Sequence, residues 1–377
     1  MPKDLVYKSY TVKLKPLTPI HVWSGKKLVY GLDIVRQDDR ACIVDFDKLP
    51  QDIVDKLLEV KAENMVNALE SFAPNVPCSE YVKFTKHPSS GTQINELAKQ
   101  VIPGSSLKGY IRTAIMYTKL KGLGSPNNIR NVLHKVLSRS VNLLNKKVKP
   151  KNVAQDLEYY FFRAHRPKKQ GGFVDSFQQL IVSDPEVSID RDCLSIEEFE
   201  VYELPAMSKI ASQYVIAVLC GELIYNIKVF SSPTDPANIN PLVNEHTQVL
   251  VKLSLLQKNN ILFESLKIFG CELLRYEIDR VKNIKNLEKY RDFLEDLVKK
   301  YCEQQTNCVV GRIGYMTGLR SKTVIGIVKN VDYRLYKKIS KKMSQKLKHT
   351  WDERTIKLVN LGGNLVGIGW CEICLNS

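Results

Sequence analysis

Alternation of hydrophobic and polar positions marks several strands along the chain. Residues 5–17 alternate in this way, residues 29–46 indicate a hairpin, and residues 178–184 form a short strand-like run. The apolar run over 214–230 is typical of one or two buried strands, and the segment 364–375 predicts a closing strand. The pattern therefore predicts β structure near both ends of the chain and in its middle.

Helical periodicity occupies the intervals between these strands. The spacing of apolar residues predicts helices over 52–72, from an N-cap at Ser105 or Ser106 to about Leu120, near 241–270, near 284–303, and over 333–351. In the last of these, Leu335, Ile339, Met343 and Leu347 recur every four residues. We expect this apolar stripe to pack in the core, with lysines on the other faces of the helix.

Strand and helix alternate in both halves of the 377-residue chain, which predicts an α+β fold of two units. We place the N-terminal unit, with a basic insertion, at 1–215 and the C-terminal unit, with a helical insertion, at 216–377. Hydrophobic residues make up 44% of the chain and charged residues 25%, as in ordinary globular proteins. The chain has neither a run of about 18 apolar residues nor a signal-peptide pattern, so we expect a cytoplasmic protein without membrane contact.

The charge is unusual, because 56 lysines and arginines face 40 acidic residues, a net charge of +16. It is concentrated: residues 119–170 hold 13 basic against 2 acidic residues, and residues 280–350 hold 18 against 6. The remainder is slightly acidic. Two basic regions on an acidic body predict contact surfaces for a polyanion such as nucleic acid.

Aromatic and basic residues interleave at the end of the first basic region. Tyr159 to Phe162 precede Arg163, Arg166, Lys168 and Lys169, and Phe173 follows them. Rings that stack on unpaired bases beside cations that hold phosphates are typical of single-strand binding. The alternative is that the aromatic run is buried and only the basic turn is exposed, and the sequence leaves both interpretations open.

Three glycine-bearing segments carry further chemistry: residues 17–25, 101–115 and 312–324. In the second, a glycine turn leads into a helix, so we expect free backbone N–H groups beside Lys108 and Arg112 to receive a phosphate. The third combines glycines with Arg312, Arg320, Ser321 and Lys322, which suits close approach of backbone to a phosphodiester.

In order along the chain, five segments resemble a known family: LTPIHVWSG, PGSSLKGYIRTAI, QQLIVSDPEVS, RIGYMTGLRSKTV and the terminal GIGWCEI. Together they resemble the RAMP superfamily of CRISPR effector subunits and are most similar to the fifth subunit family of the type III-A Csm complex. The chain departs from the pattern at Trp23, where a small residue is expected, and at Tyr315 and Met316, which replace part of a glycine run. Gly314 and Gly318 remain.

The resemblance implies two ferredoxin-like (RRM-like) domains and a non-catalytic RNA-binding subunit of an antiviral ribonucleoprotein. Such a subunit caps the crRNA filament at the 3′ end of the guide and assists 3′-end maturation by host nucleases. The implied partners are crRNA, target RNA, a backbone RAMP subunit and a small helical subunit. The candidate RNA-contacting residues are His21, Ser24, Gly25, Lys26, Gly104, Ser105, Ser106, Lys108, Arg112, Arg163, Arg166, Lys168, Lys169, Arg312, Gly314, Gly318, Arg320, Ser321 and Lys322.

An alternative function is a metal-independent endoribonuclease that processes repeat RNA, with His21 as general acid or base in an RNA-facing turn. The other histidines belong to no paired motif. Asp33, Asp38 and Asp39 could hold Mg²⁺ but are expected to be turn residues.

We expect no cofactor and no metal. Cys371 and Cys374 have zinc-ligand spacing, but on a strand their thiols would point to opposite faces. The nine cysteines are scattered and odd in number, unlike the framework of a small disulfide-rich domain.

Overall fold

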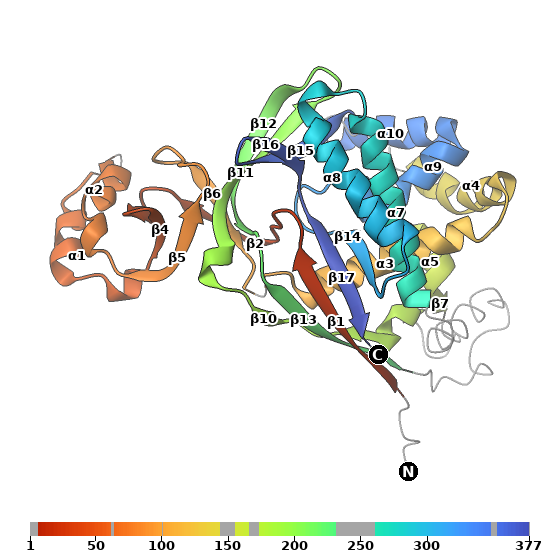
Figure 1. Ribbon diagram of the computed structural model, residues 1–377, viewed down its shortest axis with the longest axis horizontal. Helices are drawn as coiled ribbons and strands as arrows, with labels where there is room; N and C mark the ends of the chain where they lie inside the picture. The colour runs from red at the N-terminus through yellow and green to blue at the C-terminus, as the bar shows by residue number, and fades with distance from the viewer. Residues whose placement is uncertain are drawn as a thin grey trace, which may run out of the picture.

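The first of two large β-sheets brings the two ends of the chain together (Figure 1). The computed structural model describes residues 7–61, 64–99, 101–143, 155–165, 173–230, 261–347 and 353–376. The first sheet consists of β1 (Tyr7–Pro16), β9 (Leu180–Val182), β10 (Glu186–Ser188), β13 (Glu222–Phe230), β14 (Cys308–Arg312) and β17 (Trp370–Asn376). Its strands pair antiparallel in the order β10-β13-β1-β17-β14, and β9 also pairs with β13.

The second sheet is mixed and extends away from the first. Its strands are β2 (Trp23–Val29), β3 (Ile34–Gln37), β4 (Arg40–Val44), β5 (Cys78–Phe84), β6 (Gln93–Leu97), β11 (Leu194–Glu203), β12 (Ser208–Val218), β15 (Thr355–Leu361) and β16 (Asn364–Gly367). The pairs β11–β5 and β12–β6 are parallel, and the other pairs are antiparallel. A separate two-stranded ribbon joins β7 (Arg163–His165) to β8 (Phe173–Asp175).

The helices form two groups. They are α1 (Gln51–Leu58), α2 (Met65–Ser71), α3 (Gly104–Lys121), α4 (Pro126–Leu143), α5 (Gln155–Phe162), α7 (Ile261–Val281), α8 (Glu288–Val298), α9 (Ile325–Val331) and α10 (Tyr333–Leu347). In Figure 1, α1 and α2 lie with β4 in a small lobe at one end, which has its own apolar core. The longer helices gather at the other end, where α3 and α7 pack on each other and α7 packs on β14.

The α+β fold class is confirmed, and so are the predicted strands at 5–17 and 178–184 and the hairpin within 29–46. The closing strand expected over 364–375 is instead two strands, β16 and β17, which belong to different sheets. The division expected after residue 215 falls inside β12, and each large sheet combines strands from both sides of it. The two expected units therefore interleave in space.

Three helix predictions need correction. The amphipathic stretch 52–72 is broken between α1 and α2. The third helix begins at Gly104, with Pro103 in the cap position, one residue or two before the serines that we expected. Residues 241–260 lie outside the described residues, and the helix that follows them, α7, runs to Val281. The apolar stripe of α10 packs in the core as predicted, with Leu335, Ile339 and Met343 buried.

The cysteines form four disulfides, which the sequence did not lead us to expect. The pairs are Cys42–Cys78, Cys193–Cys220, Cys271–Cys302 and Cys308–Cys374, with Cys371 left as a buried thiol. Each bridge joins residues 27 to 66 positions apart, so only the folded arrangement brings the partners together. Among the described residues, no helix is long and apolar enough to cross a membrane.

Candidate nucleic-acid interface

The three glycine-bearing segments, which are far apart in the sequence, meet around one pocket of about 390 Å³. The first segment contributes Val22 and Trp23, and α3 contributes one helical face. The third segment contributes the loop after β14. The lining residues are Val22, Trp23, Ser106, Gly109, Tyr110, Thr113, Arg312, Ile313, Gly314, Tyr315, Thr317, Ser321 and Lys322. The sequence motifs therefore converge on a single concave surface.

Gly314 permits the contact between the first and third segments. Its φ is +115°, a conformation that residues with side chains rarely adopt. A Cβ at this position would lie 2.7 Å from the carbonyl oxygen of His21. The neighbouring Tyr315 N–H donates to that same carbonyl at 2.7 Å. A glycine is thus required where the loop lies against the first segment.

Two aromatic side chains at the pocket were not among the predicted contacts. Trp23 is 43% exposed, and its ring centroid lies 6.5 Å from that of Tyr315. The indole Nε1 donates to the carbonyl of Lys26 at 2.7 Å, and the Tyr315 hydroxyl donates to Gln213 at 2.9 Å. Both rings are therefore held in place. The signal was present in the sequence, because these were two of the positions that departed from the family pattern, and an exposed fixed indole can stack on a base.

Lys322 supplies a positive charge at the pocket. Its side chain is exposed to solvent, and partial desolvation by the surrounding protein lowers the pKa of its ammonium group. No carboxylate among the described residues pairs with it. A cation that is partly desolvated and lacks an ion-pair partner is well suited to hold an anion such as a phosphate.

Arg312 corrects a prediction, because it is buried and faces inward. Its Nη1 donates to Glu277 at 2.9 Å, and its Nε donates to the carbonyl of Ile368 at 2.9 Å. Burial alone would raise the pKa of Glu277, but the charges of Arg312 and Arg280 hold it below its usual value. The Tyr290 hydroxyl also donates to Glu277. The Arg312 guanidinium is therefore engaged with groups inside the protein and is not free to bind a phosphate.

The start of α3 corrects a second prediction. Gly104 is buried, and its N–H donates to the Asp184 carboxylate at 2.9 Å, so an acidic side chain occupies the expected phosphate position. A Cβ on Gly104 would lie 2.1 Å from the Ser183 carbonyl oxygen, so this glycine is required for packing against the chain after β9. Ser105 is exposed at the same helix start. Ser106, in contrast to Ser105, lines the pocket.

Lys108 and Arg112 share a helix face as predicted, but that face does not line the pocket. Arg112 donates to Asp175 at 2.7 Å and to Glu158 at 3.2 Å. Arg163 bonds the same two carboxylates, so two cations and two anions form a closed network. Burial and the Arg112 charge lower the pKa of Lys108. Arg112 and Arg163 are therefore structural residues in this state of the protein.

The aromatic run before Arg163 belongs to α5, where Phe161 and Phe162 are buried. Of the two interpretations left open, burial is correct for these two rings. Arg166, Lys168 and Lys169 lie outside the described residues.

His21 also needs correction, because we expected it in an RNA-facing turn. Its side chain is fully buried, and Nδ1 donates to the Ile216 carbonyl at 2.8 Å. Burial lowers the pKa of the imidazole to about 4, with the Ile216 hydrogen bond opposing the shift. His21 is therefore neutral at pH 7 and does not line the pocket, so the structure does not support the role of general acid or base that the endoribonuclease alternative gave it.

Some of the remaining candidate RNA-contacting residues are exposed, and others stabilise the structure around the pocket. Ser24, Gly25 and Lys26 are exposed residues of β2, where its pairing with β6 is irregular, and Ser24 donates to Glu96 at 2.7 Å. Arg320 pairs with Glu353 and lies over the Tyr276 ring at 3.5 Å, inside the protein. Gly318 has a φ of +92° in the loop. Ser321 is buried and donates to Thr317, so it fixes the loop conformation that presents Lys322.

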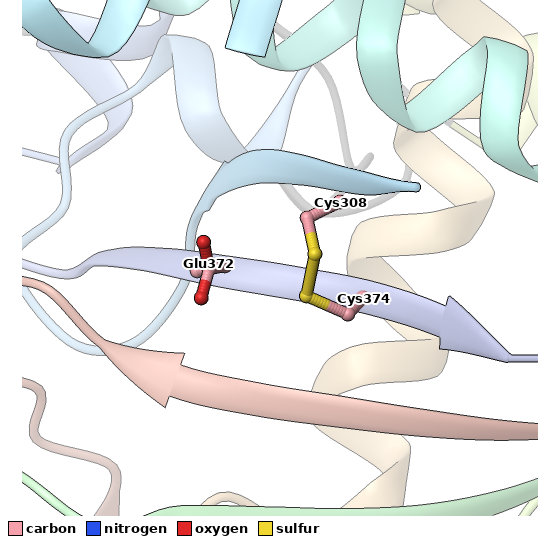
Figure 2. Close-up of side chains that lie close together, drawn as sticks. All are labelled: Cys308, Glu372 and Cys374. Carbon is pink, nitrogen blue, oxygen red and sulfur yellow. A yellow bond between two sulfur atoms is a disulfide. The ribbon is translucent and has the colours of Figure 1, made fainter. Parts of the chain in front are cut away.

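Residues of two possible metal sites make other contacts in the structure. Asp33 accepts the Val29 N–H at 2.7 Å and so closes the hairpin turn. Cys308, Glu372 and Cys374 lie within 4.8 Å of one another, but Figure 2 shows the two sulfurs bonded together, with the Glu372 carboxylate beside the bridge. Glu372 already accepts from Lys300 at 3.0 Å. Sulfurs joined in a disulfide are not thiolate ligands.

Comparisons with known proteins show which solved structures share the fold of this chain. No protein-family model and no curated protein sequence matches the chain significantly. A chain of the cryo-EM structure of a Csm–crRNA–target RNA ternary complex from a type III-A CRISPR–Cas system superposes with a TM-score of 0.67 and 21% identity, covering 97% of this chain and 100% of that chain. Csm5 of T. onnurineus, a crystal structure, gives a TM-score of 0.60 and 21% identity, covering 95% and 99%. The chain therefore shares the fold of Csm5 over nearly its whole length.

Proposed function

We propose that this chain is a Csm5-type subunit of a type III-A CRISPR (Csm) complex, where it binds RNA as a structural component. The fold shared with Csm5 supports the subunit assignment. The observation that carries RNA binding is the convergence of three distant glycine-bearing segments on one pocket that presents Trp23 and Lys322. Within the complex we place the chain at the 3′ end of the crRNA guide.

The pocket suits a single strand held by its backbone and one stacked base. The Trp23 indole offers a flat surface for a base, and the ammonium group of Lys322 offers the charge for a phosphate. The glycine loop allows the RNA backbone to come close to main-chain atoms. This arrangement reads shape and charge instead of base edges, which suits a subunit that must accept guides of any sequence.

A structural role agrees with the chemistry of the pocket wall. Burial raises the pKa of the Tyr110 phenol, and Arg312 is engaged with Glu277, so neither offers a proton or a free charge to a phosphodiester. We extend the proposal to the implied partners: crRNA, target RNA, a backbone RAMP subunit, a small helical subunit and host nucleases that trim the guide.

The test is the affinity of the full chain for a fluorescent single-stranded oligoribonucleotide between about 50 and 200 mM salt. We expect Lys322→Glu to weaken binding and to lower the slope of log affinity against log salt by about 0.7, the value for one lost single-strand phosphate contact. Trp23→Ala should weaken binding by about 1–3 kcal/mol with little change of slope.

The matched control is Lys289→Glu, at an exposed lysine of α8 that does not line the pocket. This variant makes the same charge change at a distance from the proposed contact. If it lowered the affinity and the salt slope as much as Lys322→Glu does, binding would depend on net charge alone, and the assignment of the pocket would fail.

A further inference from the structure

A second concave surface lies between α4 and the pair α9–α10, and it shares no lining residue with the glycine-lined pocket. Its volume is about 590 Å³. Arg130 of α4 donates to the Val331 carbonyl at 2.9 Å, and Lys342 of α10 donates to the Val141 carbonyl at 2.6 Å. Figure 1 shows the three helices together at one end of the molecule. Helices from the two basic regions of the sequence, α4 and α10, thus line one surface, which we call the α4–α10 groove.

The helices on both sides of the α4–α10 groove carry cations without acidic residues. Neither α4 nor α10 contains an aspartate or a glutamate, whereas α10 alone contains six lysines and arginines. Asp332 is the one carboxylate among the described residues that line the groove. It accepts from His134 at 2.6 Å and from the Leu335 N–H at 2.9 Å, where it caps α10. The Asp332 carboxylate therefore already accepts hydrogen bonds from two groups of the protein itself.

The arginines of the groove keep their charge available. Arg334 is exposed and forms no hydrogen bond or ion pair with any residue that the structure describes. Arg130 donates to the Asn127 side chain and to the Val331 carbonyl, which are neutral groups, and its charge also acts on the nearby Asp332 carboxylate. Elsewhere in the protein, buried arginines such as Arg312 pair with carboxylates. With Asp332 as the one carboxylate among its described lining residues, the groove carries a net positive charge, and Arg334 presents that charge to a partner.

Tyr333 adds a flat ring at the same place. It is 54% exposed, and its ring stacks on Tyr336 with centroids 6.0 Å apart and an interplanar angle of 24°. The Lys337 ammonium lies 5.2 Å from its centroid. The apolar stripe of α10 packs on the opposite side, so core packing does not explain an exposed tyrosine here. A fixed ring among cations matches the requirements of an unpaired base and its phosphates.

We propose that the α4–α10 groove is a second single-stranded RNA site, in which Arg130 and Arg334 hold phosphates and Tyr333 stacks on a base. This inference rests on the proposed function only in taking RNA as the ligand. The seven residues of α9 separate the Lys322 loop from the start of α10. That helix is about 10 Å long, which is short enough for one strand to contact both sites.

The experiment measures binding of a fluorescent oligouridylate, long enough to span both sites, to the full chain at several salt concentrations. We expect Arg334→Glu to weaken binding several-fold and to lower the salt slope by about 0.7. Tyr333→Ala should weaken binding about 5- to 150-fold with the slope unchanged, and Tyr333→Phe, which keeps the ring, should bind as the wild type does. Both positions are exposed, so folding is checked by the thermal midpoint. Lys289→Glu is the charge-matched control.

The outcomes separate this site from the first pocket. If Lys322→Glu weakens binding while the Tyr333 and Arg334 variants bind like the wild type, the pocket stands and the groove proposal is overturned. If only the groove variants weaken binding, the groove stands and the pocket assignment fails. If the groove variants bind RNA normally but no longer assemble with the other subunits of a reconstituted complex, the groove is a protein interface and the proposal is likewise overturned.

Discussion

Replacing His21 tests whether the first glycine-bearing segment is an interior support or a reactive turn. The imidazole is fully buried with its Nδ1–H on the Ile216 carbonyl, and burial lowers its pKa to about 4. In the unfolded chain a histidine titrates near 6.5. We therefore choose His21→Asn, because the asparagine amide can keep a donor for Ile216 but does not titrate.

The sign of the effect follows from proton uptake. As the pH falls from about 6.5 toward 4, the unfolded chain binds a proton at this histidine while the folded protein does not, so acid favours unfolding. The full difference of about 2.5 pKa units corresponds to about 3 kcal/mol, of which about 2 kcal/mol develops between pH 7 and pH 5. Below about pH 4 the folded protein binds the proton too, and this contribution no longer changes.

The assay is urea unfolding of the wild type and His21→Asn at pH 7 and at pH 5, followed by the free energy of unfolding. Other groups titrate in both proteins, so the wild type should lose about 2 kcal/mol more than the variant over this interval. If the free energy of unfolding fell equally in the two proteins, His21 would not be held neutral in the interior, and the argument against its catalytic role would lose its basis.

Three further predictions concern the supports of the pocket. Glu277→Gln leaves the buried Arg312 charge uncompensated and should lower the free energy of unfolding by about 3–5 kcal/mol, whereas Asp279→Asn on the exposed side of α7 should leave it near that of the wild type; equal effects would contradict the buried pair. Gly314→Ala should lower stability by more than Gly318→Ala, because both residues have positive φ but only the first would press a Cβ against a carbonyl oxygen, and unfolding midpoints that reverse this order would refute the close approach. Reduction of the disulfides should lower the thermal midpoint, because each bridge closes a loop of 27 to 66 residues and contributes about 4 kcal/mol in the loop-entropy estimate; an unchanged midpoint would show that the bridges are absent.

The sequence predicted the fold class and many element positions because those depend on local periodicity. The structure has the strand β1 where residues 5–17 alternate, and α10 buries the apolar residues spaced by four from Leu335 to Met343. The linear division after residue 215 does not separate the sheets, because β1 pairs with β13 and β17 from the far side of that division. Pairing between distant strands leaves no trace in the local pattern.

The candidate site was predicted at the level of segments better than at the level of side chains. The three glycine-bearing segments do meet, but charge type alone did not distinguish Lys322, which faces the pocket without an ion-pair partner among the described residues, from Arg312, which faces Glu277. That difference depends on which carboxylate lies nearby after folding. Trp23 and Tyr315 were treated as departures that weakened the family pattern, whereas their placement makes them candidates for base stacking.

The most direct test of the central claim is ultraviolet crosslinking of guide RNA to this chain in the assembled complex, with the crosslinked peptides identified by mass spectrometry. The account predicts crosslinks from the 3′ region of the guide to the peptides that contain Trp23 and Tyr315, and their loss in Trp23→Ala, Tyr315→Ala and Lys322→Glu complexes that still assemble. Crosslinks confined to other surfaces of the chain, with none at the peptides of the pocket, would contradict it.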